Sequence, residues 1–410
     1  MTRTSPAARI AAWCLVQALA ATVVAEEYRF HLVDAFTTTY GLRECYIYDI
    51  NNNGVACGTS TYQYGSSISY SGFYWSLAAG KTAVGISWPH GISDNGALAG
   101  VAQLYDIPSG QLTTVPIVPG YYYPLVLSDV NDAGLAVGSM QICNCSNSQG
   151  VLQVPYLWDA VNGARTLPVP GAKGASHVTN TGLVIGWTGG NSQPDGYVYD
   201  LETGQYFYVS SLFAGPNIQT TVVDIEEDGT IVGNRREQNG QVSYGYTWSP
   251  VSGVTLLPLP SPDYQPYVKP TSINAHGVVV GTIFTPTASS RAFVYDPGNG
   301  IRDLNLLTNT AGFTLMTATA VNDAGWIVGY GYGGGGMYKS YVLVPPLAGD
   351  LNCDAAVDVL DINPFITALS GPAAYAQQYP ECDIMNADVN ADGNADVLDI
   401  NPFVALLSQN

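Results

Sequence analysis

Charged side chains are scarce in this sequence of 410 residues, of which only 11% are Asp, Glu, Lys or Arg. Basic residues are the rarest, with 13 Lys and Arg against 32 Asp and Glu, and the formal net charge is −19. Proteins that bind nucleic acid need basic surface to displace the counterions of the phosphates. The composition therefore predicts no nucleic-acid partner and favours cations or neutral surfaces.

Long apolar runs are also missing. The longest one, residues 10–24, has about 15 residues, whereas a helix that crosses a bilayer needs ~20. Two arginines precede this run, and Val23 and Ala25 occupy the small-residue positions before a cleavage site. We expect residues 1–25 to be a signal peptide cleaved near Ala25, which predicts a secreted or cell-surface protein without a membrane span in the mature chain. A membrane anchor is the alternative interpretation.

Recognisable catalytic motifs are absent from the sequence. It contains no Gly-x-Ser-x-Gly elbow, no phosphate-binding loop and no His-Glu-x-x-His pair. The four histidines, His31, His90, His177 and His276, fall in separate parts of the chain, and a role in turns is the simplest interpretation of the last two. A catalytic function is therefore not predicted, although a pair of glycosidase carboxylates has no sequence signature of its own.

Glycine and tyrosine, in contrast, are abundant, with 45 and 28 residues. Many glycines belong to a pattern in which an apolar residue is followed by Gly at the fourth and eighth positions after it. The pattern occurs seven times, at residues 50–58, 92–100, 130–138, 178–186, 225–233, 273–281 and 321–329. A period of this size is typical of β-propellers and solenoids.

Each copy predicts a short hairpin, because Asn, Asp and Gly tolerate the left-handed backbone of a tight turn. In most copies an aromatic strand and a short fourth strand follow, which is the size of a propeller blade. The aromatic strands are FYWS at 73–76, YLWD at 156–159, YVYD at 197–200, YTWS at 246–249 and FVYD at 293–296. The second copy has only LYD at 104–106, so we expect an irregular blade there.

The ends of the repeat array complement each other. The seventh copy ends at YVLV, residues 341–344, without a fourth strand, and the segment 29–36 near the N-terminus is a strand without a partner. Pairing these two segments completes the last blade and leaves no open sheet edge. We therefore expect a mainly β, closed seven-bladed β-propeller rather than an open solenoid.

The repeat resembles the HAF repeat of bacterial extracellular proteins, in which an Ile-Asn-x-x-Gly-x-x-x-Gly turn precedes an aromatic Phe-x-Trp or Phe-x-Tyr segment. The resemblance covers nearly all of residues 46–344. It implies an extracellular β-propeller-like array without assigned chemistry, which we place at residues 27–347.

Two acidic loops, residues 350–361 and 388–399, follow the repeats. Each has side-chain oxygens at positions 1, 3, 5, 9 and 12 and adds a backbone carbonyl at position 7, which is the spacing of a twelve-residue calcium loop. The predicted ligands of the first loop are Asp350, Asn352, Asp354, Ala356, Asp358 and Asp361, and those of the second are Asp388, Asn390, Asp392, Asn394, Asp396 and Asp399.

Acidic loops also occur as solvated turns, and this alternative applies to either loop taken alone. Here both continue as DVLDINPF and then as an apolar helical segment, with a constant offset of 38 residues. Residues 350–410 contain ten acidic residues and no Lys or Arg. Because so many carboxylates repel one another without a cation, we expect two Ca²⁺ sites.

Loop followed by helix, twice, is similar to a type I dockerin, and we place this small all-α module at residues 348–410. Ala355 replaces the Gly expected at position 6 of the first loop, so the first site is expected to bind calcium more weakly. Pro364 and Pro402 fit only if they lie in the first helical turn.

The six cysteines outside the signal peptide are compatible with disulfides. Cys353 and Cys382 are the predicted pair, because both belong to the C-terminal module. With the sequence around them they resemble the dockerin-like anchors of planctomycete-type exported proteins. Disulfides or a metal cluster remain open for the other four, Cys45, Cys57, Cys143 and Cys145.

Dockerins recognise cohesins partly through loop positions ten and eleven, which the resemblance maps to Val359 and Leu360, and to Val397 and Leu398. These apolar pairs differ from the usual hydroxyl-bearing ones. We therefore expect either a cohesin-like or a cell-envelope protein as the docking partner.

The predicted function is that of a secreted, non-catalytic binding or scaffold protein. Its propeller binds a ligand or partner, with polysaccharide as one candidate, and its C-terminal module docks or anchors it through calcium. The alternative is a dockerin-borne carbohydrate-active enzyme, a glycoside hydrolase or lyase of polysaccharide catabolism.

Overall fold

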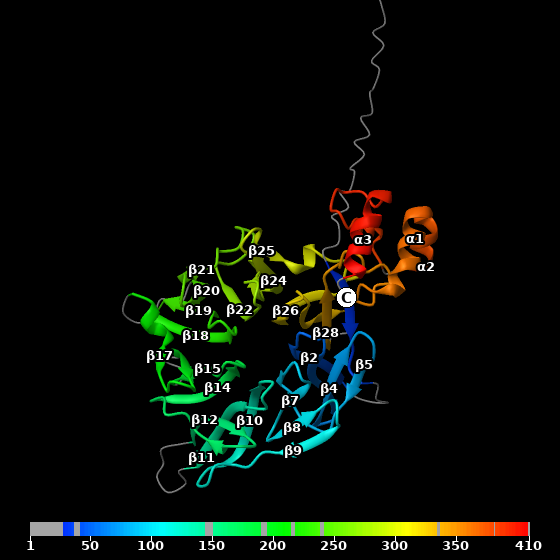
Figure 1. Cartoon of the computed structure of the whole chain (residues 1–410). Helices are drawn as coiled ribbons and strands as arrows, with labels where there is room; N and C mark the ends of the chain where they lie inside the picture. The colour runs from blue at the N-terminus through cyan, green and yellow to red at the C-terminus, as the bar shows by residue number, and fades with distance from the viewer. Residues whose placement is uncertain are drawn as a thin grey trace, which may run out of the picture.

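Seven four-stranded antiparallel sheets follow one another around a ring in the computed structural model (Figure 1). The structure describes residues 28–36, 42–143, 151–189, 195–214, 218–237, 242–333, 337–380 and 382–408. The predicted mainly β, seven-bladed propeller is therefore confirmed. The predicted signal peptide lies outside the described residues.

The first four blades are formed in chain order by consecutive strands. The first contains β2 (Leu42–Ile50), β3 (Ala56–Tyr64), β4 (Ser67–Ser76) and β5 (Gly80–Ala83). The second contains β6 (Gly91–Ile92), β7 (Ala97–Ala99), β8 (Gln103–Asp106) and β9 (Gln111–Thr114). The third contains β10 (Tyr122–Val130), β11 (Ala136–Cys143), β12 (Val151–Asp159) and β13 (Gly163–Arg165). The fourth contains β14 (Ala172–Val178), β15 (Leu183–Thr188), β16 (Asp195–Asp200) and β17 (Tyr206–Tyr208).

The fifth and sixth blades repeat this plan. One short 3₁₀ helix precedes the fifth blade, and another follows the sixth. The helix η1 (Val209–Leu212) precedes β18 (Ile218–Ile225), β19 (Ile231–Glu237), β20 (Ser243–Ser249) and β21 (Gly253–Leu256). The sixth blade contains β22 (Val268–Ile273), β23 (Val279–Phe284), β24 (Ser290–Asp296) and β25 (Gly300–Asp303), followed by η2 (Leu304–Leu306).

The seventh blade closes the ring with both ends of the repeat array. It combines β26 (Thr314–Val321), β27 (Ile327–Gly333) and β28 (Met337–Val344) with β1 (Arg29–Val33). The pairing of β1 with β28 is antiparallel and runs from Arg29 opposite Val344 to Val33 opposite Ser340. This confirms the expectation that the two segments complete one blade, and the pairing leaves β28 without an open edge.

The two glycines of each repeat have different roles in the hairpin. The first glycine has a φ between 70° and 88° in all seven copies, in the left-handed region that favours glycine. The second is required by space, because a Cβ on Gly58 would lie 2.1 Å from the Tyr46 carbonyl oxygen, and the equivalent distances in the other blades range from 1.9 to 2.7 Å. The first glycine therefore makes the turn and the second allows two strands to approach.

The close approach at the second glycine also explains the aromatic strand. In the fourth blade, the Tyr197 ring passes over Gly186 and its hydroxyl donates to the Gly174 carbonyl at 2.9 Å. Tyr246 and Tyr341 make the corresponding bonds to Thr221 and Thr317. These aromatic side chains are fully buried.

Apolar side chains fill the space between every pair of neighbouring blades. The smallest of these clusters lies between the first and second blades, where Cys57 packs against Ile86, Ile92 and Leu98. The second blade also has the shortest strands, with two residues in β6 and three in β7. This confirms the expected irregular blade.

The described C-terminal residues form short helices around a small apolar cluster of their own. They are η3 (Val359–Asp361), α1 (Ile362–Ser370), α2 (Pro372–Gln378), η4 (Ile384–Ala387), η5 (Val397–Asp399) and α3 (Ile400–Leu407). Phe365 and Phe403 stack at the centre, with ring centroids 4.1 Å apart. Pro364 and Pro402 lie in the first turns of α1 and α3, as required.

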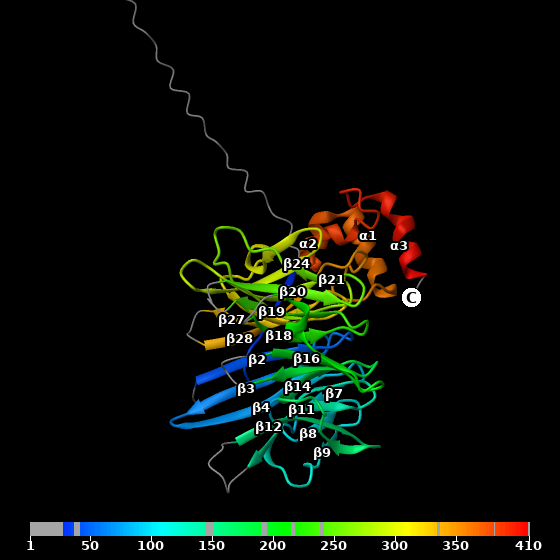
Figure 2. The same cartoon turned by 90° about the vertical axis from the view of Figure 1, so that its left-hand side faces the viewer.

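The helices lie beside the seventh blade, at the end of the blades that carries the two-glycine turns (Figure 2). No helix in the described ranges is long and apolar enough to cross a membrane. The predicted disulfide between Cys353 and Cys382 is present. Cys45 and Cys57 are buried and free, and the side chains of Cys143 and Cys145 lie outside the described part of the chain.

Candidate functional site

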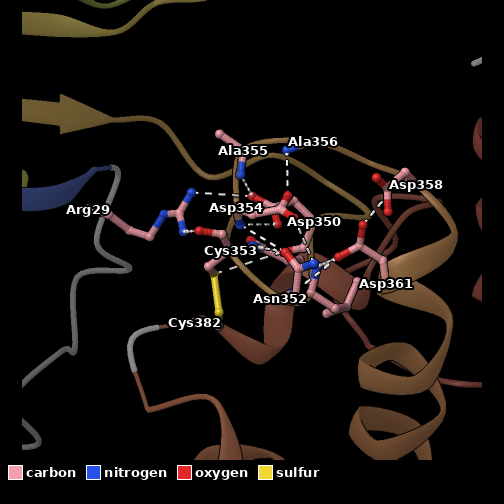
Figure 3. Close-up of polar contacts among 12 residues, drawn as sticks. Arg29, Asp350, Asn352, Cys353, Asp354, Ala355, Ala356, Asp358, Asp361 and Cys382 are labelled. Atoms are coloured by element: carbon pink, nitrogen blue, oxygen red, sulfur yellow. Dashed lines mark hydrogen bonds and ion pairs between the residues drawn. A yellow bond between two sulfur atoms is a disulfide. The ribbon is translucent and has the colours of Figure 1, made fainter. Parts of the chain in front are cut away.

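The first acidic loop begins one residue after Gly349, at the seventh blade, and its first carboxylate folds the loop back on itself. Asp350 is fully buried. Its Oδ1 accepts the backbone N–H of Asp354 at 3.1 Å, and its Oδ2 accepts that of Ala355 at 3.0 Å. Arg29 of β1 also donates to Oδ2 at 3.3 Å and to the Cys353 carbonyl at 2.9 Å (Figure 3).

The last residue of the loop, Asp361, accepts three further backbone N–H groups of the same loop. Its Oδ1 accepts the backbone N–H groups of Leu351 and Asn352 at 2.7 and 3.0 Å, and its Oδ2 accepts that of Asp358 at 2.9 Å. Burial raises the pKa of Asp361, against the lowering effect of these hydrogen bonds. Burial likewise raises the pKa of Asp350, although Arg29 opposes it.

The second loop repeats this arrangement. Asp388 accepts the N–H groups of Asp392 and Gly393 at 3.0 and 2.8 Å, and Asp399 accepts those of Asn390 and Asp396, both at 2.9 Å. In all, eight hydrogen bonds occur at matching positions of the two loops. The duplication in sequence is therefore also a duplication in backbone path.

The predicted ligands belong to these two loops. They are Asp350, Asn352, Asp354, Ala356, Asp358 and Asp361 in the first, and Asp388, Asn390, Asp392, Asn394, Asp396 and Asp399 in the second. All side-chain donors are Asp or Asn oxygens, the hard ligands that calcium prefers. Across the described ranges, no group of three His, Cys, Asp or Glu side chains is placed to hold a metal ion. The donor types fit calcium, and the two sites stay a prediction.

The loops differ at position 6. Ala355 has a φ of 69° and Gly393 has a φ of 90°. An L side chain in this region brings its Cβ close to the backbone. The sharp turn expected at position 6 is therefore present in both loops, and only the first makes it with a side chain.

Matching apolar side chains are exposed beside the two loops. Val359 and Leu360 are 72% and 62% exposed, and their counterparts Val397 and Leu398 are 70% and 63% exposed. Four further residues on α1 and α3, two on each helix, continue both patches: Ile362, Ile366, Ile400 and Val404. We call these eight residues the paired apolar faces.

A second polar site surrounds the channel at the centre of the propeller. The inner strands of all seven blades end there, around a cavity of about 230 Å³. Asp49 accepts the N–H of Ile50 at 2.8 Å and, across the blade boundary, that of Ile92 at 3.0 Å. Asp129 and Asp224 make the same two kinds of contact. Each accepts the N–H of the residue that follows it, and across the blade boundary Asp129 accepts that of Val178 and Asp224 that of Ile273. These carboxylates link neighbouring blades.

His177 lies among these carboxylates. The residue is half-buried and lines the channel, while its Nδ1 is buried and has no hydrogen-bond partner among the described residues. Burial lowers the pKa of His177, but the carboxylates of Asp224, Asp129 and Asp49 raise it further, and the net direction is upward. Burial, reinforced by Asp129, raises the pKa of Asp49 to about 7. The channel thus favours an imidazolium facing several acids.

Sequence reasoning missed this channel and expected a turn role for His177. The sequence does contain a signal for the channel. It lies at the position directly before the first apolar residue of the repeat pattern. That position is Asp in three repeats and His in a fourth: Asp49, Asp129, Asp224 and His177. A β-bulge just before it interrupts the strand in each of these repeats.

No protein-family model matches the sequence, and no curated protein sequence matches it. The resemblances to the HAF repeat and to the dockerin therefore rest on the residues quoted above.

Solved structures share the fold. The acylaminoacyl peptidase of Pyrococcus horikoshii, in its orthorhombic crystal form, aligns with a TM-score of 0.51 at 11% identity over 76% of this chain and 52% of that chain. The β-propeller domain of the Trilobed protease from Pyrococcus furiosus aligns with a TM-score of 0.36 at 10% identity over 64% of this chain and 98% of that domain. The chain spans about half the length of the peptidase (52%), and at this identity the likeness shows the propeller fold alone.

Replacing Ala355 with Gly is expected to stabilise the protein. The left-handed backbone at this residue costs an L side chain ~1–2 kcal/mol, and the greater freedom of unfolded Gly returns ~0.4–1 kcal/mol of that. We expect a net gain of about 0.5–1 kcal/mol in the free energy of unfolding of the C-terminal residues, measured by urea titration. The neighbouring Ala356→Gly, where φ is not positive, is the control and is expected to destabilise. Equal effects of both substitutions would contradict this account.

Replacing His177 with Gln is expected to destabilise the propeller more in acid than in alkali. The folded-state pKa of His177 is raised, so its contribution to stability is fully present below the unfolded value of ~6.5 and is lost as pH rises through the folded value. Urea unfolding at pH 5, 7 and 9 measures the difference between wild type and variant. The exposed His276→Gln serves as the control. A difference that stays constant over this pH range would show that His177 acts without its charge.

Proposed function

We propose that the chain is an exported binding protein whose propeller, residues 27–347, carries a ligand site and whose C-terminal residues 348–410 form a calcium-dependent, dockerin-like docking module. The observation that supports it most directly is the shared hydrogen-bond pattern of the two acidic loops. Each loop holds its backbone curled around a set of Asp and Asn oxygens. Such a duplication of both sequence and backbone path is unnecessary for solvated turns.

Calcium would be held by the twelve loop positions named above, with the ion offsetting the repulsion among the carboxylates. Asp350 and Asp361 are buried in the first loop, and Asp399 is buried in the second. In the first loop, Arg29 already provides one positive charge beside Asp350. Together with the side chain on Ala355, this favours weaker calcium binding in the first loop than in the second.

Docking would use the paired apolar faces. The two faces are related by the same offset as the loops, so they present two equivalent patches to a partner. The acidic residues around them, without any Lys or Arg from residue 350 onward, favour a partner with an apolar docking surface and a basic rim. We infer a cohesin-like or cell-envelope protein of this character.

The alternative, a carbohydrate-active enzyme that hydrolyses O-glycosyl bonds, stays a hypothesis. The channel carboxylates of Asp49, Asp129 and Asp224 each accept two backbone N–H groups that join the blades. This structural role accounts for their burial without catalysis, so the binding function is favoured.

Calcium titration of the full mature chain, after treatment with a chelator, tests the first half of the proposal. We expect two ions per chain by isothermal titration calorimetry. Asp354→Ala should remove the weaker site and Asp392→Ala the tighter one, because each deletes the position 5 oxygen of one loop. The exposed propeller variant Asp263→Ala should keep both. No uptake by the wild type, or a stoichiometry that neither loop variant changes, would refute the calcium sites.

Capture of proteins from the cell envelope of the native source tests the docking half. We expect one protein to be retained by the wild type with calcium, and to be lost both with chelator and in the double variant Leu360→Asp, Leu398→Asp. The control is Val161→Asp with Val251→Asp, which alters apolar residues that are 91% and 97% exposed on the propeller. Retention of the same proteins by both double variants would refute docking through the paired apolar faces.

A further inference from the structure

An aromatic cleft opens where the short second blade fails to cover the first. The cavity measures about 330 Å³, within the ~300–1,000 Å³ range of small-molecule sites. Its walls come from β2, β3 and β4 of the first blade, from the segment that leads into β6, and from Met337 at the start of β28 in the seventh blade. Aromatic rings and polar groups share these walls: Tyr46, Tyr48, Tyr70 and Trp88 with Glu44 and Gln63.

Two aromatic rings of the cleft, Tyr70 and Trp88, are exposed, while Tyr46 and Tyr48 are half-buried. Tyr70 and Trp88 are 43% and 37% exposed, and their ring centroids lie 5.0 Å apart in an edge-to-face arrangement. His90 links Trp88 to Tyr48, with centroid distances of 6.0 and 4.9 Å. These rings form a connected aromatic surface that is partly in contact with water, and exposed apolar patches of this kind often mark binding sites.

The backbone at Trp88 is a second unusual feature of the cleft. Its φ is 55°, in the left-handed region that bulky side chains rarely adopt. Strain of this kind persists where the surroundings hold it, and it gathers at ligand sites. The Trp88 side chain is 37% exposed and lines the cleft. The strain directs an indole toward the cleft.

The polar groups of the cleft are neutral or acidic. None of the ten residues that line it within the described chain is Lys or Arg. Burial lowers the pKa of His90, so the ring is uncharged at neutral pH, and burial raises the pKa of Tyr48 to about 12. Glu44 is the one carboxylate, and it accepts the Tyr46 hydroxyl at 2.9 Å. Such walls disfavour an anionic ligand and provide hydrogen-bond acceptors and hydroxyls.

We propose that this cleft binds a neutral saccharide, whose apolar ring face stacks on Trp88 and Tyr70 and whose hydroxyls hydrogen-bond to Glu44 and Gln63. A proline-rich peptide would also stack on aromatic rings, but proline offers no N–H donor to the Glu44 carboxylate. A saccharide offers a hydroxyl donor at almost every carbon. It can therefore hydrogen-bond to the polar groups of the cleft while its apolar ring face stacks on the aromatic rings.

This inference rests on the proposed function, because it names the ligand of the propeller. The two fail separately. A chain that binds calcium and docks through the paired apolar faces but binds no saccharide would refute the cleft and leave the docking module standing.

The test titrates the full mature chain with cellohexaose, xylohexaose, mannohexaose and a proline decapeptide by calorimetry and tryptophan fluorescence. We expect at least one hexasaccharide to bind and to shift the emission of the wild type. Trp88→Ala and Tyr70→Ala should each weaken binding about tenfold or more, because each removes one ring of the stacking surface. Trp88→Phe should retain most of the binding while losing the fluorescence change.

A matched control separates the cleft from general surface effects. Tyr206 on the fourth blade is 40% exposed and pairs edge-to-face with Tyr208 at 5.6 Å, much as Tyr70 pairs with Trp88. Tyr206→Ala should leave binding unchanged. Absence of binding to all three saccharides, equal losses in Tyr206→Ala and Tyr70→Ala, or binding of the proline peptide alone would overturn the proposal.

Discussion

The approach of one strand to the next at the second glycine of each hairpin is the contact on which the propeller depends. At Gly233 a Cβ would lie 1.9 Å from the Thr221 carbonyl oxygen, so no other residue fits there without moving the strand. The same absence of a side chain lets the Tyr246 ring cross the hairpin and donate to that carbonyl at 2.8 Å. Turn, strand spacing and buried aromatic ring thus act together in most blades, and only the second blade lacks the aromatic ring at this place.

That device was visible in the sequence because it is local. The glycines, the apolar residues between them and the aromatic strand all lie within one repeat, so spacing alone predicts the blade and its number. Closure was also predictable, since a strand at 29–36 and a blade without its fourth strand complement each other. Few residue types fit the turn, the close strand contact and the buried ring, so the sequence pattern of each repeat identifies these features.

The channel was missed despite its signal in the repeats, and the aromatic cleft could not be predicted, because both depend on contacts between repeats. Asp49 accepts the N–H of Ile92 in the next blade. Its place beside His177 of the fourth blade depends on the closure of the ring, which the spacing within one repeat does not show. The cleft lies beside the short strands β6 and β7, which leave Tyr70 on the first blade exposed. Sequence shows that the second repeat is irregular, but not which neighbour it exposes.

The two proposed sites lie at opposite ends of the blades, and the closure of the ring connects them. β28 ends at Val344 on the side of the two-glycine turns, where the C-terminal residues follow directly and Arg29 of β1 reaches Asp350. Glu44 and Gln63 lie toward the other end of the first blade, where β3 and β4 meet in a hairpin, away from α1 and α3 (Figure 2). A chain held through its C-terminal helices would therefore keep its aromatic cleft free. This separation is what a docked binding protein needs, because the anchor and the ligand then do not compete for one surface.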